Sequence, residues 1–405
     1  MKIKISDIKT TPKNMEFNFC VFGEPNQKVS DWISFWNLKT EKSGVFTNII
    51  IGDNNIYDMF ESPKMYKFVD GFSPNLNKHL HLGHLSNLIF AKSIQSLGIG
   101  EKFIAILGDT LSGSVEKEDA LDKFKSYCAS FGYNINHTYF ASEQELVDSS
   151  ILEYGYGDYA GTHVFDINGV KIVGIKSDGS STYFYQDVAL AQALIGSPKP
   201  NTFKSGSSIW STLYITGFEQ ENHFKLLNLL FPDNDHIGLG LVMVDGKKMS
   251  SSEGNVLMMD DVINQVSEKF GGDKNLAWNV ISGHILKYSP ESIKNINLKS
   301  IDDVKSSWGL YLSYTLAKMK SAGMLPIINS DFNSNQLKYS FLQSKTEKSP
   351  HYLFNSLVDH CKKISQLYTK YHIKDNIENQ KMYQPLLDDL LLGMIKIGMF
   401  DIDKV

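Results

Sequence analysis

The string His81-Leu82-Gly83-His84 places two imidazoles and a glycine where a strand-like run gives way to a helix-like run. A helix N-terminus presents unpaired N–H groups and the positive end of the helix dipole, which suit a phosphate. Gly83 would let a nucleotide approach the backbone, both imidazoles can donate to phosphate oxygens, and Lys78 just upstream adds a cation. The string predicts a phosphate site, but by itself it fits helix-capping or surface histidines at least as well.

A second string, Lys248-Met249-Ser250-Ser251-Ser252, lies far downstream, again between a strand-like and a helix-like run. Gly246 and Gly254 flank it and would permit hinge motion, Lys248 could follow departing phosphates, and Ser250 adds a hydroxyl donor. The plain alternative is a solvated Lys-Ser-Gly connector. The order of the two strings and their matching contexts favour one shared ATP site.

Tyr183 and Asp187 are spaced to share one face of a helix. An inward carboxylate is a natural partner for a guanidinium group, so the pair predicts a cationic substrate side chain. Without further support, a surface or capping Asp187 and a core Tyr183 are the simpler interpretation.

Strand-like and helix-like runs alternate from about Tyr66 to about Ser300. The alternation favours an α/β fold with a doubly wound, mostly parallel, Rossmann-like sheet, in which ligands bind at the carboxyl ends of the strands. Strands are expected over 65–72, 101–109, 165–175, 211–218 and 236–244, and helices over 86–98, 186–196, 222–231 and 258–270.

The two ends of the chain have different patterns. The first 65 residues mix β-like runs with turn residues and predict a small N-terminal module. The pattern after about Ser300 is helical and predicts an all-helical C-terminal bundle with helices within 304–323, 349–372 and 382–400. The expected domains are therefore 1–65, 66–300 and 301–405.

The composition is that of a globular enzyme. The 405 residues are 42% hydrophobic, and a net charge of −5 argues against indiscriminate nucleic-acid binding. The N-terminus lacks the apolar core of a signal peptide, and no run reaches the roughly 20 apolar residues of a membrane helix. Three well-separated cysteines predict reduced thiols rather than disulfides or a zinc site. We expect a cytoplasmic chain with no membrane partner.

Arginine is absent: all 40 basic residues counted as Lys or Arg are lysine. A lysine-biased, AT-rich genome would reduce arginine, and abundant Asn, Ile and Tyr agree with such a bias. A complete absence over this length favours selection or deliberate construction.

The two strings resemble the HIGH and KMSKS signatures of the class I aminoacyl-tRNA synthetases. Within that class, SPNLNKHLHLGHLSN, KSDGSSTYFYQDVALAQAL, ITGFEQENHF and HIGLGLVMVDGKKMSSSEGN are similar to stretches of the arginyl enzymes, and the resemblance covers roughly residues 66–405. It implies activation of arginine, or a related cationic amino acid, by ATP and nucleotide-bound Mg²⁺ without a dedicated protein metal site. The aminoacyl group would then pass to the 3′ end of a tRNA, and a monomer is expected.

The resemblance also assigns residues to roles. It implies that the protein acts by charge stabilisation and positioning, without a covalent intermediate. The catalytic set would be His81, His84, Lys78 and Lys248. The ATP set would be His81, Gly83, His84, His223, Gly238, Gly240, Lys248, Met249 and Ser250. The amino-acid set would be Ser73, Asn75, Tyr183, Asp187 and Gln220.

Several departures leave alternatives open. Serines replace the later basic position of the second signature, and the usual longer N-terminal tRNA-binding domain has no counterpart in the first 65 residues. Lys362, Lys363, Lys370 and Lys374 on the helical part could contact phosphate or simply be solvated. The alternatives are a paralogue that acylates a small amine or peptide, a catalytically silent tRNA-binding protein, and a changed specificity such as lysine or ornithine.

Overall fold

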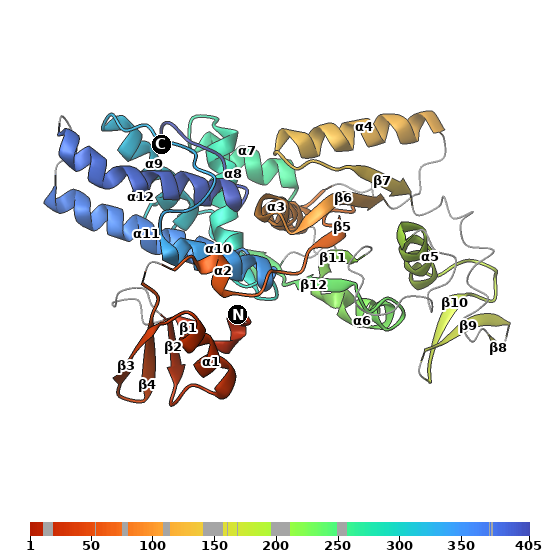
Figure 1. Ribbon diagram of the computed structural model, residues 1–405. Coiled ribbons are helices and arrows are strands. Elements are labelled where there is room, and N and C mark those ends of the chain that lie inside the picture. The colour runs from red at the N-terminus through yellow and green to blue at the C-terminus, as the bar shows by residue number, and fades with distance from the viewer. Residues whose placement is uncertain are drawn as a thin grey trace.

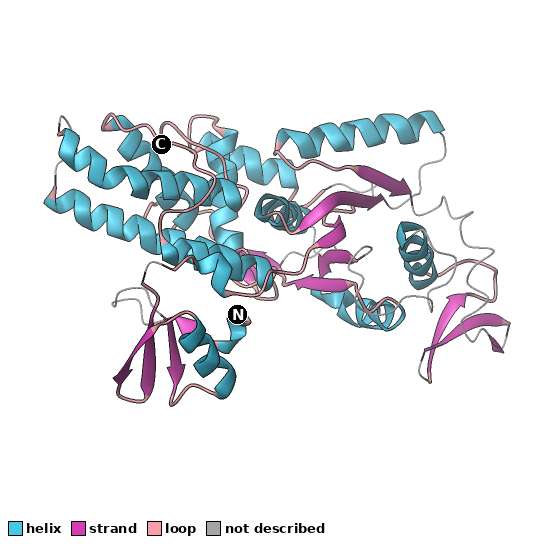
Figure 2. Cartoon of the chain, viewed as in Figure 1, coloured by secondary structure: helices cyan, strands magenta, loops and turns pink. Residues whose placement is uncertain are grey.

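The computed structural model (Figures 1 and 2) describes residues 1–10, 19–52, 54–74, 80–107, 114–140, 157–159, 161–167, 169–195, 211–248, 257–371, 373 and 376–405. Within these ranges, no helix combines the length and the apolar character needed to span a membrane.

A five-stranded parallel sheet carries the predicted phosphate site. Its strand order, β12-β11-β5-β6-β7, places the first of these strands in the middle. The chain extends the sheet first to one side of β5 and then to the other, so the topological switch point lies between β5 and β11. This confirms the predicted doubly wound fold. The strands are β5 (Tyr66–Asp70), β6 (Gly100–Leu107), β7 (His137–Phe140), β11 (Thr212–Gly217) and β12 (Asp235–Leu239).

Helices cover both faces of this sheet. α3 (Leu82–Leu97) packs its apolar side chains against one face together with Val69 and Leu213. α5 (Tyr183–Ile195) and α6 (Glu221–Leu230) cover the other face, where α6 packs against Tyr214. α4 (Ser114–Ser130) connects β6 to β7. Gly98 ends α3 with φ +67°, a left-handed conformation in which glycine carries no steric penalty.

The predicted strand over 165–175 is wrong in its placement. That run folds into two antiparallel strands, β9 (Thr162–Ile167) and β10 (Val170–Ile175), which form a separate sheet with β8 (Gly157–Tyr159). Gly169 turns the chain at φ +84°, and its N–H donates to Asp166 Oδ1 at 2.9 Å. A glycine turn inside the apolar run therefore makes a hairpin outside the parallel sheet.

The run over 236–244 is likewise divided. β12 ends at Leu239, and the chain then enters a second small sheet of β13 (Val242–Val244), β14 (Lys247–Lys248) and β15 (Lys294–Ile296). The break lies at Gly240, whose N–H donates to the Pro290 carbonyl at 2.9 Å. A Cβ there would lie 2.3 Å from the Ser292 carbonyl oxygen, so only glycine fits against this turn.

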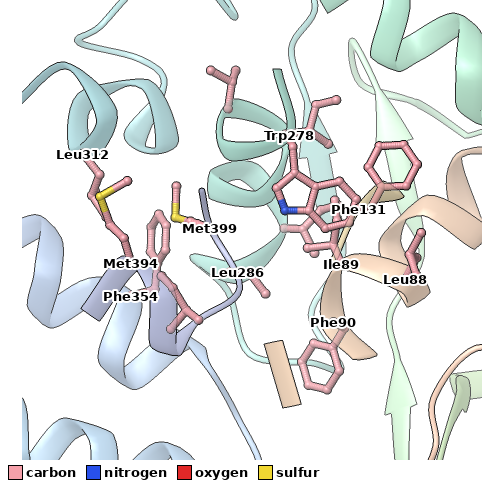
Figure 3. Close-up of a cluster of buried hydrophobic side chains, with 14 of the residues drawn as sticks. Leu88, Ile89, Phe90, Phe131, Trp278, Leu286, Leu312, Phe354, Met394 and Met399 are labelled. Atoms are coloured by element: carbon pink, nitrogen blue, oxygen red, sulfur yellow. The ribbon is translucent and has the colours of Figure 1, made fainter. Parts of the chain in front are cut away.

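The C-terminal part is helical, as predicted. Trp278 of α8 stacks on Phe131 at 5.0 Å, and the same buried cluster runs from α3 to Met394 and Met399 (Figure 3). The apolar core is therefore continuous across the domain boundary expected near residue 300, which stays a prediction. The helices are α7 (Met259–Glu268), α8 (Lys274–Leu286), α9 (Trp308–Ser321), α10 (Asn335–Thr346), α11 (His351–Lys370) and α12 (Ile377–Lys396).

The N-terminal segment forms a four-stranded antiparallel sheet, in the order β1-β2-β4-β3, with one helix packed on it. Its core extends beyond the module, because Phe19 lies 5.0 Å from the ring of Tyr339 on α10. Tyr57 adds a hydrogen bond to Asp331 at 2.8 Å. The elements are β1 (Lys9–Thr10), β2 (Phe19–Phe22), α1 (Gln27–Phe35), β3 (Lys39–Ser43), β4 (Phe46–Ile50) and α2 (Ile56–Met59).

Candidate active site

His81 and His84 lie at the N-terminus of α3, just beyond the carboxyl end of β5. His81 is the N-cap residue, and its Nδ1 accepts the N–H of Gly83 at 3.1 Å. The Nδ1 of His84 accepts the N–H of His81 at 3.1 Å, and the two rings are 4.0 Å apart. Since each Nδ1 is an acceptor, each neutral ring carries its hydrogen on Nε2. Burial lowers the pKa of His81, which favours that neutral form.

Gly83 is required by this arrangement. A Cβ at Gly83 would lie 2.9 Å from Cε1 of His81 and would displace the ring. The structure thus adds a packing role to the predicted backbone approach of a nucleotide. The resulting donor set, two Nε2–H groups at a helix N-terminus, fits a polyphosphate.

Backbone pairing joins the first signature to the segment that follows the second one. Leu82 N donates to the Leu257 carbonyl at 3.0 Å, and Met259 N donates to the Leu80 carbonyl at 2.9 Å. These bonds flank a bridge between His81 and Met258. The segment that follows the second signature is therefore held directly against the first.

The start of the second signature is anchored by a hairpin. Asp245 and Gly246 turn β13 into β14 at φ +48° and +78°, and β14 ends at Lys248. Gly246 N donates to Asn295 Oδ1 at 2.9 Å, and Asp245 Oδ1 accepts Leu298 N at 2.9 Å. Gly246 is a turn residue here, and its predicted hinge motion stays a prediction. Lys78, Asn75, Met249, Ser250 and Gly254, and the side chain of Lys248, lie outside the described residues.

Asp187 and His223 meet between α5 and α6. Oδ2 of Asp187 and Nε2 of His223 are 2.5 Å apart, and both side chains are about three-quarters buried. The structure therefore brings together one residue predicted for the amino acid and one predicted for adenosine. Tyr183, one turn before Asp187, is 80% exposed, and Gln220 is an exposed residue at the end of a 3₁₀ turn that leads into α6.

Asp70 was not predicted from the sequence. It ends β5 at the switch point, is 5% exposed, and accepts a hydrogen bond from the Ser73 hydroxyl. Ser73 in turn accepts Ile106 N at 2.7 Å. Burial raises the pKa of Asp70 to about 7, and the charge of Asp187 adds to the rise, although the Ser73 hydrogen bond opposes it. The sequence contains one signal for Asp70: it is a carboxylate at the end of an apolar strand, shortly before Ser73, which was predicted to bind the amino acid.

The two carboxyl groups make this end of the sheet acidic. Asp70 comes from β5 and Asp187 from α5, and the charge of Asp187 adds to the rise in the pKa of Asp70. The described residues contain no group of three or more His, Cys, Asp or Glu placed to hold a metal ion. Paired carboxyls in a buried setting suit an organic cation.

Gly238 and Gly240, both predicted to bind ATP, lie in and directly after β12, an edge strand of the central sheet. Gly238 lies in β12 and lines a pocket of about 420 Å³ with Phe218 and the 289–291 turn. Gly240 follows the strand, where its packing against Ser292 already accounts for a glycine. Their part in nucleotide binding stays a prediction.

Comparison with known proteins points to one class of enzyme. No protein-family model matches the chain. The arginine–tRNA ligase of Lactobacillus delbrueckii subsp. bulgaricus is 29% identical over 170 residues, 36% of this chain and 28% of the relative. That of Lactobacillus johnsonii is 28% identical over 276 residues, 58% of this chain and 47% of the relative.

Solved structures extend the likeness over nearly the whole chain. The arginyl-tRNA synthetase of Thermus thermophilus superposes with a TM-score of 0.70 and 14% identity, covering 98% of this chain and 96% of that one. The chain has the fold of an arginyl-tRNA synthetase. The Plasmodium falciparum arginyl-tRNA synthetase gives a TM-score of 0.63 at 16% identity, covering 94% of this chain and 89% of that one.

In this fold, Asp70 ends β5, and the helix start at His81 that follows this strand pairs with Met258. The sequence matches, by contrast, span less than half of the length of the two ligases. The resemblance to class I synthetases made from the residues is thus supported by both comparisons at the level of fold and class.

Proposed function

We propose that the chain activates arginine, or a related cationic amino acid, with ATP and transfers it to the 3′ end of a tRNA. The observation that carries the proposal is the pairing of Leu80–Leu82 with Leu257–Met259 at the start of α3. The buried Asp70, whose pKa the charge of Asp187 raises further, supports it. We infer that the start of α3 binds phosphate, that the segment preceding Leu257 carries the second signature towards it, and that the two carboxyl groups receive a cation.

In the proposed reaction, a carboxylate oxygen of the amino acid attacks the α-phosphorus of ATP. The new O–P bond forms as the bond to pyrophosphate breaks, which yields the aminoacyl adenylate. The Nε2–H groups of His81 and His84 donate to phosphate oxygens as charge develops on them. Lys78 and Lys248 would add cations, and nucleotide-bound Mg²⁺ would neutralise further charge.

The amino acid is bound by the acidic groups. Asp187, oriented by His223, accepts the cationic side chain, and Asp70 accepts a second cationic group of the substrate. Ser73 and Gln220 are proposed to line the same space, and Tyr183 its outer edge. Gly238, Gly240 and His223 are proposed neighbours of adenosine.

A tRNA partner is supported by lysines and aromatic rings on the bundle. Lys287 and Lys362 lie 4.9 Å and 5.4 Å from the ring centroid of Trp308, and Lys318 lies 3.9 Å from that of Tyr368. Lysines next to aromatic rings suit a nucleic-acid strand. Of the other predicted lysines, Lys363 bonds Gln336 at 3.0 Å, Lys370 is exposed, and Lys374 lies outside the described residues.

The test is ATP–pyrophosphate exchange with single amino acids, with and without total tRNA. Exchange confined to arginine and dependent on tRNA is the expected result, followed by charging of arginine tRNA. Exchange with arginine that ignores tRNA would favour transfer to a small amine or peptide, and exchange with lysine or ornithine would replace the substrate. No exchange with any amino acid would favour the alternative of a tRNA-binding protein that does not form the adenylate.

A further inference from the structure

Tyr133 has a buried hydroxyl beside the candidate site, and no described residue is its hydrogen-bond partner. It follows α4 and is 0% exposed, and its hydroxyl forms no hydrogen bond with any residue that the structure describes. A Cβ on Gly71 would lie 2.8 Å from that hydroxyl oxygen, so the hydroxyl reaches the backbone next to Asp70. The ring packs against Phe103 at 6.0 Å. An unpaired buried hydroxyl is unfavourable, so its retention at this position calls for an explanation.

The groups around Asp70 come from several elements. Asp187 comes from α5, with His223 of α6 as its partner. Burial raises the pKa of Tyr133 and of Tyr214, and the charge of Asp70 adds to both rises. Tyr214 of β11 lies opposite Asp70 in the sheet register, next to Thr212. Among the described groups, Ser73 alone donates a hydrogen bond to the Asp70 carboxyl.

These contacts fit a carboxyl that is about half neutral near pH 7 without a ligand and ionised with one. With no cation nearby, burial and the charge of Asp187 both oppose ionisation of Asp70. A cation bound between the two carboxyls would reverse that balance. An ionised Asp70 could then accept a second hydrogen bond, and the Tyr133 hydroxyl is a donor that no other described group uses.

We propose that Tyr133 is a positioning residue that donates its hydroxyl to Asp70 when a cationic ligand binds, and that binding releases a proton from Asp70. The proton leaves the carboxyl for the solvent as the ligand's positive charge arrives, so charge is balanced within the site. The inference rests on the proposed function in taking a cationic amino acid as the ligand.

The experiment is titration calorimetry of the full chain with L-arginine in two buffers of different ionisation enthalpy, from pH 6 to 8. The wild-type protein is expected to release about half a proton per arginine near pH 7, and Asp70→Asn should abolish the release. Tyr133→Phe is expected to weaken binding about tenfold and to move the pH dependence of binding to higher pH.

The control is Tyr383→Phe, which removes a buried tyrosine hydroxyl that donates to the Tyr371 carbonyl in the helical bundle. Binding by this variant should match the wild type. Thermal unfolding of each variant checks that it is folded. If Tyr133→Phe does not fold, proton release by the wild type and its loss in Asp70→Asn still decide whether Asp70 is the source.

The outcomes separate the two proposals. Wild-type binding of arginine without proton exchange, or a Tyr133→Phe variant that matches the wild type at every pH, overturns this inference alone. Failure of the wild type to bind arginine overturns the proposed substrate instead.

Discussion

Asp187 and His223 lie 2.5 Å apart, although one comes from α5 and the other from α6. A carboxylate held by an imidazole is fixed in direction, which prepares it to receive a cation from the open side. The contact with His223 therefore fixes the direction of the Asp187 carboxylate.

Asp187→Asn is expected to lower kcat/KM for arginine in pyrophosphate exchange at least about 100-fold, because a neutral amide cannot balance a buried cation. His223→Gln should cost less, about tenfold and mainly in KM, since it loosens the carboxylate without removing it. Lys225→Gln, on the same helix and exposed, is the matched control. Equal activity of Asp187→Asn and the control would show that Asp187 does not bind the substrate.

His81→Ala and His84→Ala should each reduce kcat by about 100-fold or more while binding of arginine is retained, because the lost donors act on developing phosphate charge. Gly83→Ala should act in the same direction, since the new Cβ would meet the His81 ring at 2.9 Å. Single-turnover adenylate formation measures the chemical step. Wild-type rates in both histidine variants would contradict the proposed phosphate site.

Asp70 should make stability depend on pH. Its pKa is raised in the folded protein to about 7, above the usual 3.8, so its contribution is full below about pH 4 and is lost as the pH rises through 7. In urea unfolding at pH 8, the free energy of unfolding of Asp70→Asn should therefore exceed that of the wild type by at most about 2–4 kcal/mol. The gain should be smaller at pH 5. A gain that is the same at both pH values would show that Asp70 is not the titrating group.

Lys92 is a buried lysine of α3, 5% exposed, whose Nζ lies 3.6 Å from the ring centroid of Phe400. Burial lowers its pKa from 10.5 to about 7, so folding is disfavoured increasingly as the pH falls from about 10 to 7. Lys92→Met should raise the free energy of unfolding at pH 6 by about 1–3 kcal/mol, and by less at pH 9, because the Phe400 contact offsets only part of the burial. Urea unfolding at both pH values measures the two free energies. A Lys92→Met variant that is less stable than the wild type at pH 6 would contradict the prediction.

The absence of arginine predicts that synthesis of the chain continues when arginyl-tRNA is depleted. Expression under such starvation should persist for the wild-type gene but fall for a variant carrying Lys225→Arg and Lys305→Arg, two exposed positions. An arginine-containing protein from the same vector is the control. An equal fall in the expression of all three proteins would contradict the prediction and would favour compositional bias as the reason for the missing arginine.

Local patterns predicted the parts of this chain that depend on neighbours in sequence. The 3.6-residue and two-residue periodicities placed β5, α3, β6, α6 and β11 nearly where they lie, and the first signature identified the helix start at His81. The same patterns failed over 165–175, where the glycine turn at Gly169 made one apolar run into two strands.

Tertiary structure decided which distant residues meet. The amino-acid sequence by itself determined the helix start that orients His81 and His84, because capping hydrogen bonds are local. The turn before Lys248 is held by the distant Asn295 and Leu298, so tertiary structure anchors it. Only folding could set Leu257 against Leu82, or His223 against Asp187, because those contacts depend on strand order and on helix packing across the sheet. The raised pKa of Asp70 is of the second kind, since it arises from burial and from Asp187, neither of which is a property of the strand that carries it.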